Sequence, residues 1–149
     1  MKFLVLVLLA LLSISFASAS HPNYQCGIYQ CAPGHSCVCD AGVYRCVYHC
    51  NELTIIQTIT NSWSDNNGKE FKTQVSVDII NNTKRTVKDV IIATDADLAF
   101  NQIWGVNKNG YLLDLPNYAT IAPGAKYTFG YINNGKTVAH LYVGNVYLI

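Results

Sequence analysis

All six cysteines of the chain lie between Cys26 and Cys50. An even number of cysteines at such close spacing, in an exported protein, predicts a disulfide framework rather than a hydrophobic core. We expect three disulfide bonds in a small, loop-rich N-terminal knob whose stability comes from the crosslinks. The sequence does not select one pairing among the many possible. The six residues are Cys26, Cys31, Cys37, Cys39, Cys46 and Cys50.

Zinc is the alternative role for clustered cysteines. The spacings contain no paired C-x-x-C units, which structural zinc sites commonly use. The histidines do not supply the missing ligands, because His35 and His49 lie within the cysteine cluster while His21 and His140 lie outside it. We therefore expect neither a metal site nor a cofactor.

The first 19 residues have the features of a signal peptide. Lys2 is followed by an apolar run over residues 3–12, and Ala17-Ser18-Ala19 is a small-x-small cleavage site. Cleavage after Ala19 would release a secreted, extracellular protein. The apolar run is shorter than the roughly 20 residues that a membrane helix requires, and no later run approaches that length. We expect no membrane partner.

The charge balance excludes another class of partner. Lysine and arginine total 10 against 9 acidic residues, and charged residues form only 13% of the chain. A chain of this kind has no basic surface for nucleic acid. Its polar side chains are mainly amides and hydroxyls, which suit a neutral ligand such as a sugar.

The remaining sequence alternates between strand and turn patterns. Apolar residues recur at every second position in several segments, and Asn-Gly and Pro-Gly turns separate them. These patterns predict an all-β fold, an antiparallel β-sandwich preceded by the disulfide-rich knob. The expected organisation is a signal peptide over residues 1–19, the knob over 20–51 and the sandwich over 52–149. The predicted strands include residues 71–79, 87–93, 127–131 and 139–143.

One glycosylation sequon is present. Asn81-Asn82-Thr83 has the N-x-S/T pattern and stands at a predicted turn. A glycan on Asn81 is therefore expected.

Catalysis has one candidate pair of residues. Asp95 and Asp97 stand two positions apart after a β-branched run, and two carboxyl groups can hydrolyse a glycoside. Aspartate is also common at strand ends for reasons of turn geometry, and no other catalytic motif accompanies the pair. We expect no catalytic residues, and a small wall-modifying or glucan-hydrolysing enzyme is the alternative.

Three aromatic residues are candidates for ligand binding. Trp63 and Tyr118 stand among polar and turn-forming residues, so we expect both to be exposed. Trp104 lies between apolar neighbours and is the one of the three expected to fill the core. Exposed aromatic rings offer flat apolar surfaces on which the C–H face of a pyranose can stack.

The region from about residue 53 to residue 149 resembles the family-49 carbohydrate-binding module. Its Pro-Gly turn followed by the F-G-Y-I segment is the most specific part. The matching motifs are Thr58-x-Thr60-x-x-Trp63, Ile103-Trp104-Gly105-Val106, Leu115-Pro116-x-Tyr118, Pro123-Gly124 and Phe129-Gly130-Tyr131-Ile132.

The resemblance implies a non-catalytic β-sandwich that binds cellulose or a related β-glucan through Trp63, Trp104 and Tyr118. A module of this kind behind a cysteine-rich segment is also similar to secreted, cellulose-binding matrix and coat proteins of social amoebae. That likeness implies that the cysteine-rich segment contacts another matrix protein. A further alternative is an interaction or inhibitor protein in which the knob is the active part.

Overall fold

The structure is a computed structural model of the chain, and it describes residues 25–96, 98 and 102–149. The predicted signal peptide and Asp97 lie outside these residues. The described chain consists of strands joined by turns and loops, as the patterns predicted. It contains no helix long or apolar enough to cross a lipid bilayer.

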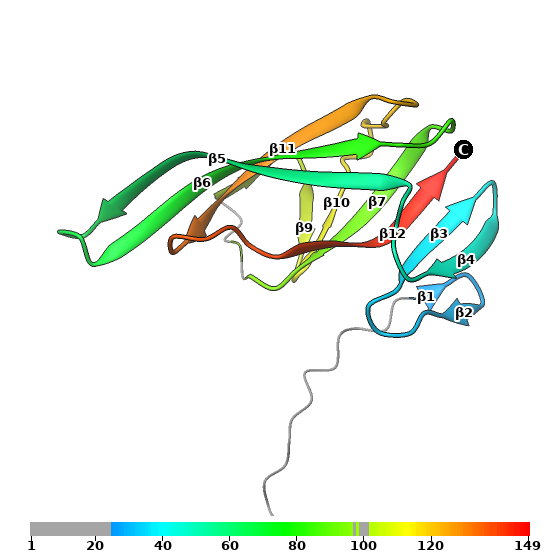
Figure 1. The fold of residues 1–149 in the computed structure, drawn as a ribbon, viewed down its shortest axis with the longest axis horizontal. Helices are drawn as coiled ribbons and strands as arrows, with labels where there is room; N and C mark the ends of the chain where they lie inside the picture. Colours follow the sequence, from blue (N-terminus) through cyan, green and yellow to red (C-terminus); the bar gives the residue numbers. More distant parts are fainter. Residues whose placement is uncertain (1–24, 97, 99–101) are drawn as a thin grey trace, which may run out of the picture.

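Four strands form the first sheet, in the order β5-β6-β11-β8, of which β5, β6 and β11 are labelled in Figure 1. All neighbours in this sheet are antiparallel. The hairpin of β5 and β6 is the longest feature of the fold, and its tip projects beyond the rest of the sandwich (Figure 1). The strands are β5 (Leu53–Asp65), β6 (Glu70–Asn81), β11 (Lys126–Asn134) and β8 (Ile103–Trp104).

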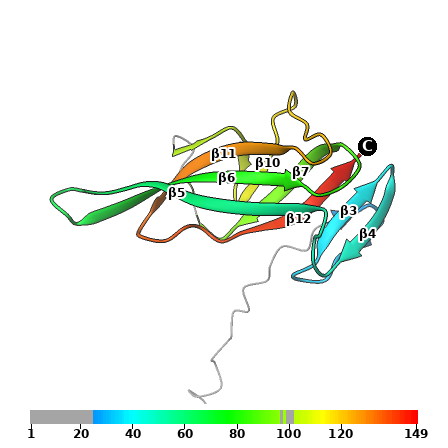
Figure 2. The same ribbon diagram turned by 45° about the horizontal axis from the view of Figure 1, so that its top comes forward.

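The second sheet has six strands in the order β4-β3-β12-β7-β10-β9, of which β3, β4, β7, β10 and β12 are labelled in Figure 2. A separate two-stranded ribbon of β1 (Gln25–Cys26) and β2 (Tyr29–Gln30) lies beside β3 and β4. The six strands are β4 (Val43–Val47), β3 (Ser36–Asp40), β12 (Leu141–Leu148), β7 (Val87–Thr94), β10 (Leu112–Asp114) and β9 (Asn107–Asn109).

The core lies between the two sheets. Alternate residues of β6 point inward, with Val75, Val77 and Ile79 fully buried, while Phe129 and Tyr131 of β11 lie beside them. The second sheet contributes β-branched and leucine side chains from the opposite side. The all-β sandwich is confirmed. Its contributors to the core from the second sheet include Val38, Val90, Ile92, Leu113, Val146 and Leu148.

The cysteine-rich segment is part of the sandwich. Strand β3 pairs with the C-terminal strand β12 over Cys37–Asp40, and this pairing is parallel. Val38 of the same strand is completely buried in the sandwich core. The second sheet is therefore mixed rather than purely antiparallel, and the cysteine-rich segment shares a sheet and a core with the rest of the sandwich.

The structure contains two disulfide bonds instead of the three expected. Cys26 is bonded to Cys37 and Cys31 to Cys46, while Cys39 and Cys50 carry free thiols. Cys39 is held within β3, between its neighbours β4 and β12. Cys50 lies on the link that leads into β5, where its thiol donates to Glu52.

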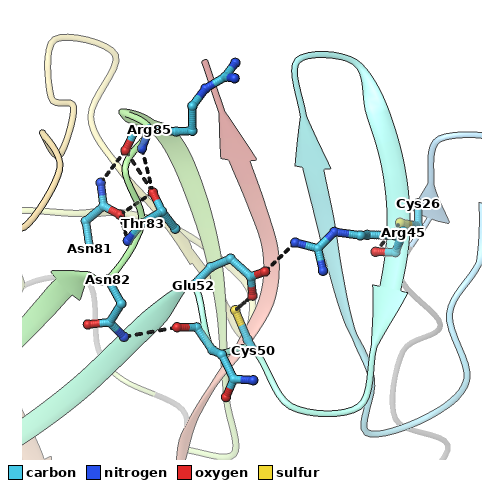
Figure 3. Close-up of polar contacts among 9 residues, drawn as sticks. Cys26, Arg45, Cys50, Glu52, Asn81, Asn82, Thr83 and Arg85 are labelled. Atoms are coloured by element: carbon cyan, nitrogen blue, oxygen red, sulfur yellow. Dashed lines mark hydrogen bonds and ion pairs between the residues drawn. The ribbon is translucent and has the colours of Figure 1, made fainter.

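Polar contacts fix the link between the cysteine-rich segment and the first sheet (Figure 3). The guanidinium of Arg45 on β4 forms an ion pair with Glu52, immediately before β5. The side-chain amide of Asn82 donates to the Asn51 carbonyl at 3.1 Å and to the hydroxyl of Thr54 at 2.8 Å. Because the ion pair is partly exposed, it contributes little stability, and the shared sheet and core dominate this junction.

Asn81 is buried at the end of β6, a position that argues against the glycan predicted there. Its side-chain nitrogen donates to the carbonyls of Arg85, Ile121 and Ala122 at 2.7, 2.9 and 3.1 Å. Its oxygen accepts from the backbone and hydroxyl of Thr83 (Figure 3). The residue is 0% exposed, so the folded chain has no space for a sugar on this nitrogen.

Candidate functional site

Two tryptophans lie on the outer face of the four-stranded sheet. Trp63 of β5 is paired with Lys72 of β6, and Trp104 of β8 is paired with Gly130 of β11. Lys72 and Gly130 alternate with the inward-pointing residues of their strands, and paired residues point to the same side of a sheet. Both indoles therefore belong to the face turned away from the core. Strand spacing places their Cα atoms roughly 20 Å apart.

A β-bulge in β5 decides the direction of Trp63. The register with β6 shifts between Ile59 and Asn61, which leaves Thr60 as an extra residue. By simple alternation from the buried Leu53, residue 63 would point toward the core. The bulge reverses the alternation, because one additional residue moves all later side chains of the strand to the opposite face. Trp63 thus lies on a strand and is half-buried, rather than exposed in a polar loop as the sequence suggested.

Trp104 is at the surface, which corrects the expectation that it fills the core. Its side chain lies over Gly130, so closely that a Cβ atom at this glycine would be 2.2 Å from the indole Cζ2 atom. Trp104 is 46% exposed, while Gly130 beneath it is buried. One side of the ring therefore rests on the sheet and the rest remains open to solvent.

A glycine conformation and a hydrogen bond from Tyr127 hold the turn that follows Trp104. Gly105 has a φ of 83°, a left-handed conformation that favours glycine. The hydroxyl of Tyr127 donates to the Gly105 carbonyl at 2.6 Å. This bond holds the backbone next to Trp104 against β11, which restricts the position of the indole.

Tyr118 is near this end of the site but not on the sheet. It lies in the loop after β10 and is 85% exposed. Burial raises the pKa of Tyr127, and the neighbouring phenol of Tyr118 raises it further. Tyr118 is therefore near Tyr127, which is paired with the buried Ile79 and so is on the inner side of the sheet. Trp63 stands on the far strand, on the outer side.

The surface between the aromatic rings is polar and carries little net charge. Asp78 accepts hydrogen bonds from Lys126 at 2.7 Å and from Thr128 at 2.6 Å, and these contacts hold its pKa below the usual value. The outward side chains also include the apolar Ile56, Ile80 and Ile132. The others are mainly amides and hydroxyls. They include Thr54, Thr58, Asn61, Gln74, Ser76 and Asn134.

This arrangement is suited to a neutral, flat, hydroxyl-rich ligand. The rings offer apolar surfaces of fixed orientation, and the amides and hydroxyls between them can exchange hydrogen bonds with a ligand at its edges. We define the outer binding face as Trp63, Trp104 and the outward residues of β5, β6 and β11 between them, with Tyr118 at its margin.

The catalytic alternative receives no support from the described residues. The side chain of Asp95 accepts a hydrogen bond from the backbone amide of His140 at 2.8 Å, and its own amide donates to the His140 carbonyl. This is a structural role at the end of β7. Its predicted partner, Asp97, lies outside the described residues.

One cluster in the described chain has the geometry of a metal site, but it has another explanation. The sulfur atoms of Cys26, Cys31 and Cys46 lie within 4.8 Å of one another. All three belong to the two disulfide bonds. A disulfide sulfur is not a thiolate, the form of cysteine that binds a metal ion.

Sequence reasoning missed two features of this face. The bulge at Thr60 leaves no pattern in the residues around it. Gly130, however, interrupts an apolar strand, and a glycine inside a strand often marks the close approach of another group. That signal could have placed a ring over Gly130.

Comparisons with known proteins identify the region that carries this face. The model of the family described as "Carbohydrate binding domain CBM49" matches residues 53–136. Stalk-specific proteins B and A of Dictyostelium discoideum are 39% and 38% identical to the chain. Each alignment covers 98% of this chain and 99% of the relative.

A solved structure, the chitinase ChiA74 from Bacillus thuringiensis, is a distant match. Its TM-score is 0.43 at 19% sequence identity, and the match covers 60% of this chain and 15% of the chitinase. At this distance the likeness carries no argument about fold or activity.

Proposed function

Because the chain belongs to the carbohydrate-binding domain family CBM49, we propose that it is a secreted, non-catalytic protein that binds cellulose through the outer binding face. The observation that carries this proposal is the position of Trp63 and Trp104. The register of the sheet directs both rings to one exposed face, with hydrogen-bonding side chains between them.

Cellulose fits this face for physical reasons. Its chains are uncharged ribbons whose sugar rings present C–H groups on both faces and hydroxyls along the edges. A tryptophan ring can stack on the C–H groups, and amides can bind the hydroxyls. Two separated rings can engage different sugars of one stiff chain, which raises the overall affinity above that of either contact. The ring of Tyr118 provides a further stacking surface for a sugar at the margin of the face.

Three further observations support an extracellular, structural role. The N-terminal residues have the pattern of a signal peptide, and disulfide bonds persist in oxidising compartments. The two relatives are named as stalk-specific proteins. We propose that this chain is likewise a component of an extracellular matrix, wall or coat.

A cellulose pull-down tests the proposal. The purified full chain is incubated with microcrystalline cellulose and compared with the double variant Trp63→Ala/Trp104→Ala. Tyr111→Ala is the matched control, because Tyr111 is also exposed but lies at the turn between β9 and β10. We expect retention of the wild type and the control, and loss of the double variant.

The other results are equally informative. Equal retention of the double variant would remove the role of the outer binding face, and absence of wild-type retention would remove cellulose as the ligand. Tyr118→Ala should weaken binding less than either tryptophan substitution, since Tyr118 lies at the margin. Release of reducing ends from cellulose during incubation would contradict a non-catalytic role.

A further inference from the structure

A second concave site lies at the other end of β5 from the Trp63 hairpin. It is a crevice of about 300 Å³ between the start of β5, the start of β12 and residues 48–50 of the cysteine-rich segment. Its lining includes Tyr48, Cys50, Leu53, Ile55, Leu141 and Tyr142. We call it the Tyr48 crevice.

The crevice exists because the sandwich is open at this edge. Strand β5 is at the end of its sheet. Strand β3 begins to pair with β12 at Asn145, beyond residues 141–143, which pair with β7. The hydroxyl of Ser36 closes one end by donating to the Val143 carbonyl at 2.6 Å.

The walls of the crevice combine an apolar floor with an aromatic rim. Leu53, Ile55, Leu141 and Val143 form the floor and belong to, or pack against, the sandwich core. At the rim, Tyr48 is 67% exposed although its ring is held at both sides. Its centroid lies 5.3 Å from that of His35 and 4.3 Å from that of His49, both in edge-on contacts.

A stiff, exposed aromatic ring beside an apolar floor is a favourable surface for a sugar. Because neighbouring rings already restrict Tyr48, less side-chain entropy is lost when a ligand stacks on it. The volume of about 300 Å³ is at the lower end of the range for small-ligand pockets. The crevice is therefore suited to a short segment or an end of a glycan.

The lack of charged side chains in the lining favours a neutral ligand. No aspartate, glutamate, lysine or arginine is among the lining residues. Burial and the nearby Glu52 carboxylate raise the pKa of the Cys50 thiol to about 11, so this group is also uncharged near neutral pH. A charged ligand would lose its hydration here without gaining a partner.

We propose that the Tyr48 crevice is a second binding site for a neutral glucan and that the protein can hold two glucan chains at once. The identity of the ligand rests on the function proposed above. Ile55 of the crevice is roughly 26 Å from Trp63 along β5. It also points to the inner side of the sheet, since it is paired with the buried Ile79. A fibril surface lying on the outer binding face therefore cannot also enter the crevice.

The crevice and Trp63 lie at opposite ends of the molecule, while Trp104 lies between them along the strand direction. In Figure 1 the tip of the β5–β6 hairpin is at one end, and β3, β4 and the start of β5 are at the other. A chain bound in the crevice would belong to a different fibril from the one on the outer face. The expected consequence is that the protein crosslinks fibrils as well as coating them.

Fibril bundling tests the proposal with the full-length mature protein. Dispersed cellulose nanofibrils are mixed with wild type, with Tyr48→Ala/Tyr142→Ala and with the control Tyr111→Ala, and bundles are collected by low-speed sedimentation. We expect the crevice variant to remain bound to the fibrils but to lose bundling, while the control keeps both. Bundling that persists undiminished in the crevice variant would overturn the proposal.

Two further measurements distinguish a failure of the crevice proposal from self-association of the protein and from a failure of the proposed cellulose binding. Sedimentation of the protein alone must show a monomer, because bundling by a self-associated protein would contradict a second glucan site. Titration of Trp63→Ala/Trp104→Ala with a soluble cello-oligosaccharide, followed by NMR, must shift the resonances of Tyr48 and Tyr142. That result would stand even if the outer face failed to bind cellulose, and absence of these shifts would overturn the crevice site.

Discussion

Trp104 lies directly over Gly130, and the absence of a side chain at this glycine is what allows the contact. The nearest indole atom would be 2.2 Å from a Cβ atom at position 130. Gly130 adopts no left-handed backbone conformation, unlike most of the other glycines. Glycine is therefore needed at position 130 because the indole occupies the space of a side chain. The backbone conformation there would allow alanine.

Gly130→Ala is expected to weaken cellulose binding by displacing the Trp104 ring. The added methyl group occupies the position of the indole, so the ring must move away from the face. We expect a loss of about tenfold in affinity, equivalent to about 1.4 kcal/mol, measured by depletion isotherms on cellulose. The double variant Gly130→Ala/Trp104→Ala should bind no worse than Trp104→Ala alone. An additive loss would show that Gly130 acts independently of the ring.

Tyr127→Phe is expected to loosen the turn that carries Trp104. The substitution removes the hydroxyl that donates to the Gly105 carbonyl at 2.6 Å. The free energy of unfolding should fall by about 1 kcal/mol, as measured by urea denaturation, and Trp104 fluorescence should become more accessible to a quencher. Tyr111→Phe, at an exposed turn, is the control and should change neither quantity. Unchanged quenching in Tyr127→Phe would contradict its positioning role.

Asn81→Ala should be severely destabilising. The side chain is fully buried and satisfies three carbonyls, an amide and a hydroxyl. Removing it leaves several buried groups without partners, so we expect a loss of roughly 2–4 kcal/mol by urea denaturation. Asn82→Ala is the neighbouring control and should cost less, because its contacts are exposed.

The burial of Asn81 also predicts that the sequon remains unmodified. Peptide mass mapping of the protein secreted by a eukaryotic host should find Asn81 without a glycan. A fully glycosylated and correctly folded product would contradict the buried position of this residue.

Acid should weaken the fold through Asp78. The pKa of this carboxyl is lowered in the folded chain by its hydrogen bonds to Lys126 and Thr128. A lowered folded pKa means that the carboxylate contributes stability above its unfolded pKa of about 4 and that this contribution is lost as the pH falls through the folded pKa. Urea denaturation from pH 7 downward should therefore show a steeper loss below about pH 4 in wild type than in Asp78→Asn. Parallel curves would exclude this contribution.

Alkylation of thiols tests the cysteine pairing. The unfolded, unreduced chain should react at Cys39 and Cys50 only. In the folded chain Cys50 should react slowly at pH 8, because its pKa is raised to about 11, and faster as the pH approaches that value. Mass spectrometry of the labelled peptides gives the result. Complete absence of labelling in the unfolded protein would indicate that these two cysteines are bonded after all.

The amino-acid sequence alone was sufficient for the fold class and the family. Alternating apolar residues and Asn-Gly or Pro-Gly turns are local signals, and they located much of β6, β7 and β11. The predicted segment over residues 139–143 covered only the start of β12, which continues to Leu148. The family resemblance is confirmed by the match over residues 53–136. The exposure of Tyr118 was also predicted correctly, since Pro116-Asn117 marked its loop.

Only the tertiary structure decided how these elements face one another. The bulge at Thr60 directs Trp63 outward, and the pairing with Gly130 brings Trp104 to the surface. The parallel pairing of β3 with β12 likewise joins residues from opposite ends of the sequence. Local patterns report which residues favour a strand, but register is set by contacts between distant strands. A shift of one residue in the pairing turns every side chain of a strand to the opposite face. The positions of the candidate residues therefore depended on pairings that no local segment encodes.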